Sequence, residues 1–317
     1  MMTLMPSLAI MAAAVGLCPA NAPAQAAQAL LPHTFVSAVR GDDAGDCTHA
    51  TPCRTFQRAH DRTDSDGEIM VLDAGDYSAL TIDKAITIVN DGAGDAGVLT
   101  SDGTGITINA PAAASVNLRG LTIQGVGFGG GSGIRFNSGG TLVVANCFIH
   151  NHGHAGIDFF PIGNSNLSMW NTLVADNGGQ GIIVRPTGAS AVTASFNNVA
   201  LYNNSRAGLL VRGLDSTGTI DVTVTESTAA NNSDGFRLDA GHAAASLALV
   251  RAVAADNRLH GIAAVGRSAL LRVAASSITG NALSWIAGDG ALVQSFGDNT
   301  IAGNGDGDPR PPGVPKY

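Results

Sequence analysis

Seven side chains between residues 135 and 239 are well suited to bind an acidic ligand. They are Arg135, Asp158, Phe160, Arg185, Arg212, Arg237 and Asp239. An arginine fork binds a carboxylate through two parallel N–H donors, and an aromatic ring can stack on a sugar. If the fold gathers these residues, they form a groove for an acidic polysaccharide. The competing interpretation is a solvated surface whose Arg–Asp pairs contribute under about 1 kcal/mol each.

A repeated pattern predicts which of these residues lie together. The segment VADNGGQGIIV (174–184) returns as ALYNNSRAGLLV (200–211), AANNSDGFRL (229–238) and AADNRLHGIAA (254–264). Self-similarity at a period of 20–50 residues indicates a solenoid. The units are marked by asparagines 23 to 28 residues apart: Asn151, Asn177, Asn204, Asn232, Asn257, Asn281 and Asn304.

Within each unit, apolar residues alternate with others after the glycine, as Phe236 and Leu238 do on either side of Arg237 after Gly235. Alternation of this kind predicts strands with one face inward. Several short strands per unit predict an all-β fold: a single-stranded right-handed parallel β-helix of about nine to ten coils, spaced about 4.8 Å apart. Outward residues then form two rows, Arg135, Asp158, Ile183, Leu210, Arg237 and Ala263, and Asn137, Phe160, Arg185, Arg212, Asp239 and Val265.

The recurring asparagines have a structural explanation. Asparagine tolerates the left-handed backbone conformation of a tight turn. Stacked on successive coils, its side-chain amides can also bond one another and satisfy groups that water cannot reach. We therefore predict an internal ladder formed by Asn151, Asn177, Asn204, Asn232, Asn257 and Asn281.

Composition argues against a nucleic-acid partner, and the first 29 residues indicate export. Of the 317 residues only 13% are charged, and the net charge of −8 argues against nucleic acid. Residues 1–29 carry no charge, and the apolar run from Leu8 to Leu17 is too short to span a bilayer. This segment is predicted to be a signal peptide, removed as the protein reaches the periplasm, the cell surface or the medium.

Export also explains the cysteines. Cys47 and Cys53 flank the short loop CTHATPC and are predicted to form a disulfide in an oxidising compartment. Cys147 lies within a repeat and is predicted to be a packed thiol.

The two ends of the solenoid need protection, because unpaired strands and exposed apolar layers aggregate. Residues 30–66 are predicted to form an N-terminal cap region, in which Thr51-Pro52 opens a short helix with Phe56, Ala59 and Thr63 on one side. The β-helix domain is predicted to cover residues 30–305. Residues 306–317, rich in proline and glycine, are predicted to form an irregular tail.

A family resemblance supports this architecture. The segment TFVSAVRGDDAGDCTHATPCRTFQRAHDRTDSDGEIMVLDAGDYSALTIDKAITI (34–88) resembles the opening segment of pectin-lyase-like right-handed β-helix proteins. With the downstream repeats, the resemblance extends to about residue 305. It implies a polysaccharide partner and, for an enzyme, a uronate lyase or epimerase.

The family's catalytic equipment is only partly matched. Uronate lyases resembling pectate lyase hold calcium with several acidic residues and use an Arg or Lys base. Here the resemblance implies that Asp158 polarises or holds the substrate carboxylate and that Arg185 or Arg212 is the binder or base, with calcium as the ion of such a site. Asp158 and Asp239 lie three coils apart, too far for one ion. The Asp-Pro-His-Asp motif of mannuronan C-5 epimerases is matched only by Asp158, and no Asp-Asp pair of the polygalacturonase kind lies on this face.

Three histidines, His150, His152 and His154, could instead ligate a metal. No carboxylate lies within that run, so no metal site is predicted. The sequence thus favours a secreted β-helix that binds or modifies an acidic polysaccharide. The alternative is a non-catalytic envelope or cell-surface module in which the solenoid is a rigid binding or spacer element.

Overall fold

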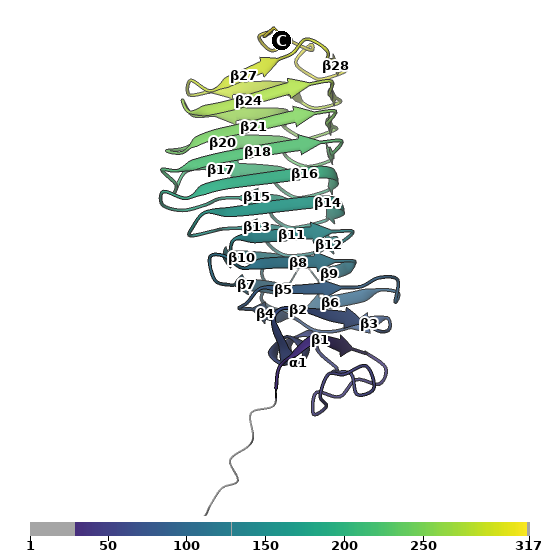
Figure 1. Ribbon diagram of the computed structural model, residues 1–317. Coiled ribbons are helices and arrows are strands. Elements are labelled where there is room, and N and C mark those ends of the chain that lie inside the picture. Colours follow the sequence, from purple (N-terminus) through teal and green to yellow (C-terminus); the bar gives the residue numbers. More distant parts are fainter. Residues whose placement is uncertain (1–28, 128, 316–317) are drawn as a thin grey trace, which may run out of the picture.

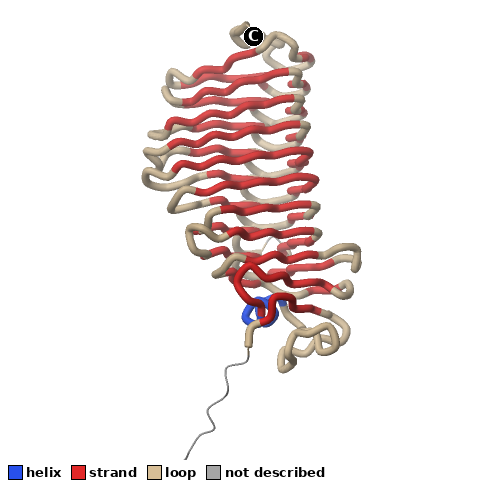
Figure 2. The backbone as a smooth tube through the Cα atoms, in the orientation of Figure 1, coloured by secondary structure: helices blue, strands red, loops and turns tan. Residues whose placement is uncertain are grey.

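Residues 29–127 and 129–315, which the computed structural model describes, wind into a right-handed parallel β-helix of about nine coils (Figure 1). The predicted signal peptide lies outside these residues except for Ala29. Strand stacks along the helix axis dominate the molecule, and one short helix lies at the N-terminal end (Figure 2). The predicted fold class is confirmed.

The strand after each repeat glycine belongs to a nine-stranded parallel sheet. Its strands are β4 (Leu80–Ile82), β7 (Ile106–Asn109), β10 (Ile134–Ser138), β13 (Ile157–Phe159), β15 (Ile182–Val184), β17 (Leu209–Arg212), β20 (Phe236–Asp239), β23 (His260–Val265) and β26 (Leu283–Gly288). Each strand pairs only with its counterparts on adjacent coils, so equivalent residues of successive repeats form straight columns.

The remaining strands form a nineteen-stranded sheet that wraps the other sides of the solenoid. It contains β1 (Leu31–Val36), β2 (Thr63–Val71), β3 (Gly75–Asp76), β5 (Ile86–Val89), β6 (Ala96–Thr100), β8 (Ser115–Arg119), β9 (Leu121–Gly125), β11 (Thr141–Ala145), β12 (Phe148–His150), β14 (Ser165–Ala175), β16 (Ala191–Tyr202), β18 (Thr219–Thr225), β19 (Thr228–Ala230), β21 (Ala244–Val250), β22 (Val253–Ala255), β24 (Ala269–Ala274), β25 (Ser277–Thr279), β27 (Leu292–Ser295) and β28 (Thr300–Ala302).

The core is the interior of the solenoid. Every inward position predicted after the repeat glycines is buried, for example Ile182 and Val184, each 0% exposed. Phe136 and Phe159 stack on adjacent coils with ring centroids 4.5 Å apart. Burial of one such apolar side chain stabilises the fold by roughly 1.5–3 kcal/mol. The repeat therefore builds a rigid wall on which the outward side chains stand.

A ladder of asparagine amides runs through this interior. The Nδ2 group of Asn177 donates to Oδ1 of Asn204 at 2.9 Å, and that of Asn204 donates to Oδ1 of Asn232 at 3.0 Å. Asn257 and Asn281 continue the ladder to Asn304. Each backbone N–H also donates to the Oδ1 of the next coil, as Asn204 N does to Asn232 at 2.9 Å. Turn groups that are closed to water are thus satisfied.

The predicted place of Asn151 in the ladder is wrong. Its backbone is left-handed, with φ 60°, and the next residue, His152, occupies the ladder position. The N–H of His152 donates to Oδ1 of Asn177 at 3.1 Å. The same offset holds elsewhere: the left-handed turn residue precedes the ladder asparagine, as Asp176 (φ 57°) precedes Asn177. The sequence pattern assigned both the left-handed turn and the ladder bond to one residue. In the structure, the first of two adjacent residues forms the turn and the second forms the ladder bond.

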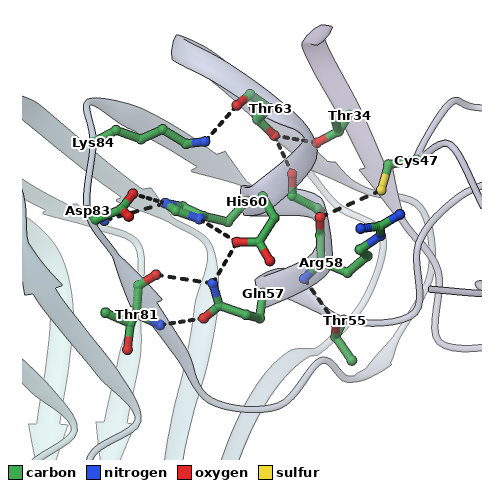
Figure 3. A network of polar contacts seen from close by, with 12 residues as sticks. Thr34, Cys47, Thr55, Gln57, Arg58, His60, Thr63, Thr81, Asp83 and Lys84 are labelled. Carbon is green, nitrogen blue, oxygen red and sulfur yellow. Dashed lines mark hydrogen bonds and ion pairs between the residues drawn. The ribbon is translucent and has the colours of Figure 1, made fainter. Parts of the chain in front are cut away.

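The N-terminal end is closed by the helix α1 (Phe56–Arg62). The helix does not open at Thr51-Pro52 as predicted, because Thr55 is its N-cap and accepts a hydrogen bond from the N–H of Arg58. Phe56 and Ala59 face the core, both 0% exposed. Polar side chains tie the helix to the first coil (Figure 3), where Gln57 accepts from the N–H of Thr81 at 2.8 Å.

The cysteines behave as predicted. Cys47 and Cys53 form a disulfide beside this helix. Cys147 is buried, and burial raises the pKa of its thiol to about 11. A thiol of this kind is protonated at neutral pH and is chemically inert.

Residues after 305 close the other end of the solenoid. Asp308 accepts hydrogen bonds from the backbone N–H and the Nδ2 group of Asn304, both at 2.8 Å, and so terminates the ladder. These bonds hold the pKa of Asp308 below its ordinary value. The chain then pairs through Val314 N with Ser295 O at 2.8 Å. In the described part of the chain, no helix has the length and apolar character needed to cross a membrane.

Candidate functional site

The outward columns of the nine-stranded sheet bring most of the predicted site residues to one face. Arg135 lies opposite Asp158, and Arg212 lies opposite Asp239, in the register of adjacent coils. Ile183 and Leu210 separate Asp158 from Arg237 in the first column. The predicted residues therefore form two clusters on one wall rather than a single group.

Asp158 is the centre of the first cluster. Its side chain is buried, and Arg185 grips it through Nε–Oδ1 and Nη2–Oδ2 hydrogen bonds, each 2.7 Å long. Arg135 donates through Nη1 to Oδ2 at 2.5 Å. The hydrogen bonds that Arg185 donates to Asp158 are the main reason that the pKa of Arg185 lies above its ordinary value. Both carboxylate oxygens are thus occupied by guanidinium donors.

Phe160 supports the same two arginines. The guanidinium carbons of Arg135 and Arg185 lie 4.7 and 4.5 Å from the centroid of its ring. This distance is within cation–π range. Phe160 is therefore a platform for the arginines, and this arrangement differs from the predicted stacking surface for a sugar.

A cavity of about 450 Å³ opens beside this cluster, and we call it the basic groove. The side chains that define it are Arg135, Asp158, Arg185, Arg206, Arg212 and His154, with Ile183 on its floor. Four guanidinium groups face one carboxylate, so the groove carries a formal charge of +3 on a chain whose net charge is −8. Such a local concentration of positive charge attracts anions.

Two arginines of the basic groove are free to contact a ligand. Within the described residues, neither Arg206 nor Arg212 has a carboxylate within 4.0 Å. Arg206 was not among the predicted residues because it lies in a turn, outside the strand columns. Its backbone N–H donates to Gly179 O on the previous coil at 3.0 Å, which places it beside the groove. The sequence signal that could have found Arg206 is its position two residues after the ladder residue Asn204.

Arg237 and Asp239 form the second cluster, separate from the basic groove. The Nε group of Arg237 donates to Asp239 Oδ1 at 3.0 Å, and its Nη1 lies 3.8 Å from Asp234 Oδ2. Nδ1 of His260 lies 2.5 Å from Asp234 Oδ1. Asp234 and His260 were missed, although each directly precedes a repeat glycine on neighbouring coils. With its donors directed to Asp239 and Asp234, Arg237 is less available than Arg212.

The three histidines considered as metal ligands do not come together around one point. His150 stacks on Phe148, His152 is buried in the ladder position, and His154 faces the basic groove. No group of three or more potential ligands gathers anywhere in residues 29–127 and 129–315. Calcium also lacks a carboxylate cage here, since both oxygens of Asp158 are bound by arginines.

Comparisons with solved structures show which folds are similar. Pectate lyase Pel9A superposes with a TM-score of 0.63 at 14% identity, over 83% of this chain and 74% of that chain. The A-module of mannuronan C-5 epimerase AlgE4 from Azotobacter vinelandii gives a TM-score of 0.36 at 14% identity, over 79% and 91%. Lacto-N-biosidase from Eubacterium ramulus gives 0.37 at 12% identity, over 90% and 67%. No curated protein matches the chain in sequence.

A family model described as "Right handed beta helix region" matches residues 72–220 and 104–275, two overlapping spans that together cover more than half of the chain. The matched spans contain the repeat glycines, the asparagine ladder as far as Asn257, and the basic groove. The likeness to pectate lyase Pel9A agrees with this match at the level of the fold. The chain belongs to the right-handed β-helix family.

Proposed function

We propose that this protein binds an acidic polysaccharide in the basic groove. The observation that carries the proposal is the presence of two unpaired arginines, Arg206 and Arg212, beside two others that Asp158 holds in place. Arginines without a carboxylate partner next to like charges create a local positive potential, which an anionic ligand neutralises. A chain of carboxylates supplies that neutralisation.

Each residue of the basic groove has a distinct role in this proposal. Asp158 positions Arg135 and Arg185, because its oxygens are already bound and cannot also hold a substrate carboxylate. Neither Nη1 of Arg185 nor Nη2 of Arg135 is used in that contact. These atoms can donate to a ligand, together with the guanidinium groups of Arg206 and Arg212.

The proposed location is outside the cytoplasm. The disulfide between Cys47 and Cys53 forms and persists in oxidising compartments. Acidic polysaccharides are also components of cell walls and extracellular matrices, where a rigid β-helix with an external groove can reach them. Removal of residues 1–29 as a signal peptide is part of this proposal.

Replacing Arg212 with alanine is expected to weaken binding of an acidic oligosaccharide by about 10- to 150-fold. A charge-assisted hydrogen bond contributes roughly 1.5–3 kcal/mol, which corresponds to this range. Isothermal titration calorimetry with hexagalacturonate and with hexamannuronate measures the dissociation constants. Binding should weaken further as salt is raised, because exposed charges are screened.

Arg272→Ala is the matched control, since Arg272 is an exposed arginine on the outer face of the nineteen-stranded sheet. It removes the same charge from the chain and should leave the dissociation constants unchanged. Equal weakening by both variants would reduce the proposal to non-specific attraction. Absence of binding by the unmodified protein to any acidic glycan would refute it.

Catalysis at the same groove is a second candidate, because Arg212 is free to reach a bound uronate. In a lyase reaction, the C5–H proton passes to a base and a C4=C5 double bond forms. The C4–O bond breaks, and its electron pair leaves on the oxygen of the departing sugar chain, which takes up a proton to become a hydroxyl. Absorbance of the unsaturated uronate after incubation with pectate or alginate detects this reaction. Product that disappears in Arg212→Ala supports a lyase, whereas binding without product supports the non-catalytic module.

A further inference from the structure

A second groove lies on the nineteen-stranded sheet, away from the basic groove. It is a cavity of about 480 Å³, within the range of small-ligand sites. One outward column crosses β1, β2, β5, β8, β11 and β14, which are stacked in sequence in Figure 1. We call this cavity the apolar groove, and its column contains Phe35, Met70, Val89, Arg119, Ala145 and Trp170.

The column has the dimensions of a short linear ligand. Five steps between adjacent strands, at about 4.8 Å each, give a length of about 24 Å. An aromatic ring stands at each end, and Trp170 is 40% exposed. Beyond Trp170 the next residue of the column is Asn197, so the apolar character ends there. The partly exposed indole ring, at the end of a contiguous apolar column, offers a surface on which a ligand can stack.

Polar groups accompany the apolar column. Asp91 and Arg119 form an ion pair at 3.1 Å, while Glu68 and Asn117 lie in the neighbouring column. Two carboxylates and one guanidinium give these groups a formal charge of −1. This charge is opposite in sign to that of the basic groove and disfavours a polyuronate. Carboxylate, amide and guanidinium groups together supply both acceptors and donors for hydroxyl groups.

These properties favour a neutral glycan over a peptide or a protein surface. An extended peptide has backbone N–H and C=O groups that need partners. The strands under the apolar groove already bond one another from coil to coil and offer it no free edge. A stable protein interface buries about 800 Å² per partner, whereas this column is one or two residues wide. The hydroxyls of a glycan can be satisfied by side chains alone.

We propose that the apolar groove is a second carbohydrate site, which binds a neutral hexose or pentose chain by stacking on Trp170 and hydrogen bonding to Glu68, Asn117 and the Asp91–Arg119 pair. This site is independent of the acidic-polysaccharide function proposed above. With both grooves occupied, the β-helix holds two chemically different glycans on different faces.

Tryptophan fluorescence gives a direct assay, because the chain has only Trp170 and Trp285. In a Trp285→Phe background, titration with cellohexaose, mannohexaose and xylohexaose should produce a saturable change with at least one of them. Calorimetry should then show that Trp170→Ala weakens this binding by about 10- to 30-fold, the effect expected when an aromatic stacking contact is lost. Asn197→Ala, the next position in the column, should leave it unchanged.

The two proposals can fail separately. Arg212→Ala should leave neutral-oligosaccharide binding intact, and Trp170→Ala should leave hexagalacturonate binding intact. The inference is overturned if none of the three neutral oligosaccharides binds at millimolar concentration, or if Trp170→Ala binds as well as the parent. It is also overturned if sedimentation shows a dimer that Trp170→Ala dissociates, because the occupant would then be a second copy of the chain.

Discussion

Replacing Asn232 with alanine is expected to lower the free energy of unfolding by about 3–5 kcal/mol. The Nδ2 group of Asn232 donates to Leu201 O at 2.9 Å, and its Oδ1 accepts from both N and Nδ2 of Asn204. Alanine leaves these buried groups without partners, and each unsatisfied group costs roughly 1–3 kcal/mol. Urea unfolding followed by circular dichroism measures the change.

Asn197→Ala serves as the control for this stability prediction. Asn197 is exposed and donates to Thr225 Oγ1 on the next coil at 2.8 Å, so it forms a coil-to-coil bond in water. Its loss should cost less than about 1 kcal/mol. If the two variants unfold at the same urea concentration, the buried ladder does not have the stabilising role assigned to it.

Acidification is expected to destabilise the protein through His152 by about 3 kcal/mol between pH 6.5 and pH 4. His152 is 0% exposed, and burial is the main reason that its pKa falls to about 4. The hydrogen bond to Ile123 O opposes this shift, and nearby His150 adds to it. Because the unfolded chain takes up the proton at about pH 6.5, stability is full above that pH and is lost as the pH falls toward 4.

Unfolding at pH 7 and at pH 4.5 should therefore separate the parent from His152→Asn. Asparagine does not titrate and matches the side chain at the equivalent positions of the next coils. The variant should lose less stability on acidification, whatever its stability at pH 7. Parallel losses in the two proteins would show that His152 is not the group responsible, and would point to His60 and His150, whose pKa values are also lowered by burial.

The architecture was predictable because a strand reports its burial through simple alternation. Ile134 and Phe136 alternate with Arg135 in the same way that Phe236 and Leu238 alternate with Arg237, and all four inward residues are buried. Once these inward positions were aligned, the outward columns followed from parallel pairing alone. The placement of Arg135 opposite Asp158, a contact between residues 23 positions apart, needed nothing more.

Features that depend on a shift of one residue were not predictable from the pattern. Asn151 carries the residue type of a ladder member, but the left-handed turn takes it and moves the ladder position to His152. The sequence cannot separate these two tasks when adjacent residues are both polar. The predicted start of the capping helix was wrong for a similar reason. Both Thr51 and Thr55 are acceptable N-caps, and the helix uses Thr55.

The contact partners of the individual site residues could not be predicted from the sequence either. Asp158 was expected to face a ligand, but its bonds to Arg135 and Arg185 turn it into a holder of the two guanidinium groups. Arg206 reaches the basic groove from a turn whose path depends on the coil before it. The direction of a side chain outside a strand is set by local packing. Alignment of the repeats into columns predicts directions only for residues within the strands.

Arginine-specific modification tests the central claim that an acidic glycan occupies the basic groove. The protein is treated with phenylglyoxal in the presence and absence of polygalacturonate, and the modified residues are mapped by mass spectrometry. We expect the glycan to protect Arg206 and Arg212, whereas Arg272 on the nineteen-stranded sheet should be modified equally in both cases. Equal protection of all three arginines, or modification of Arg206 and Arg212 at an unchanged rate, would contradict it.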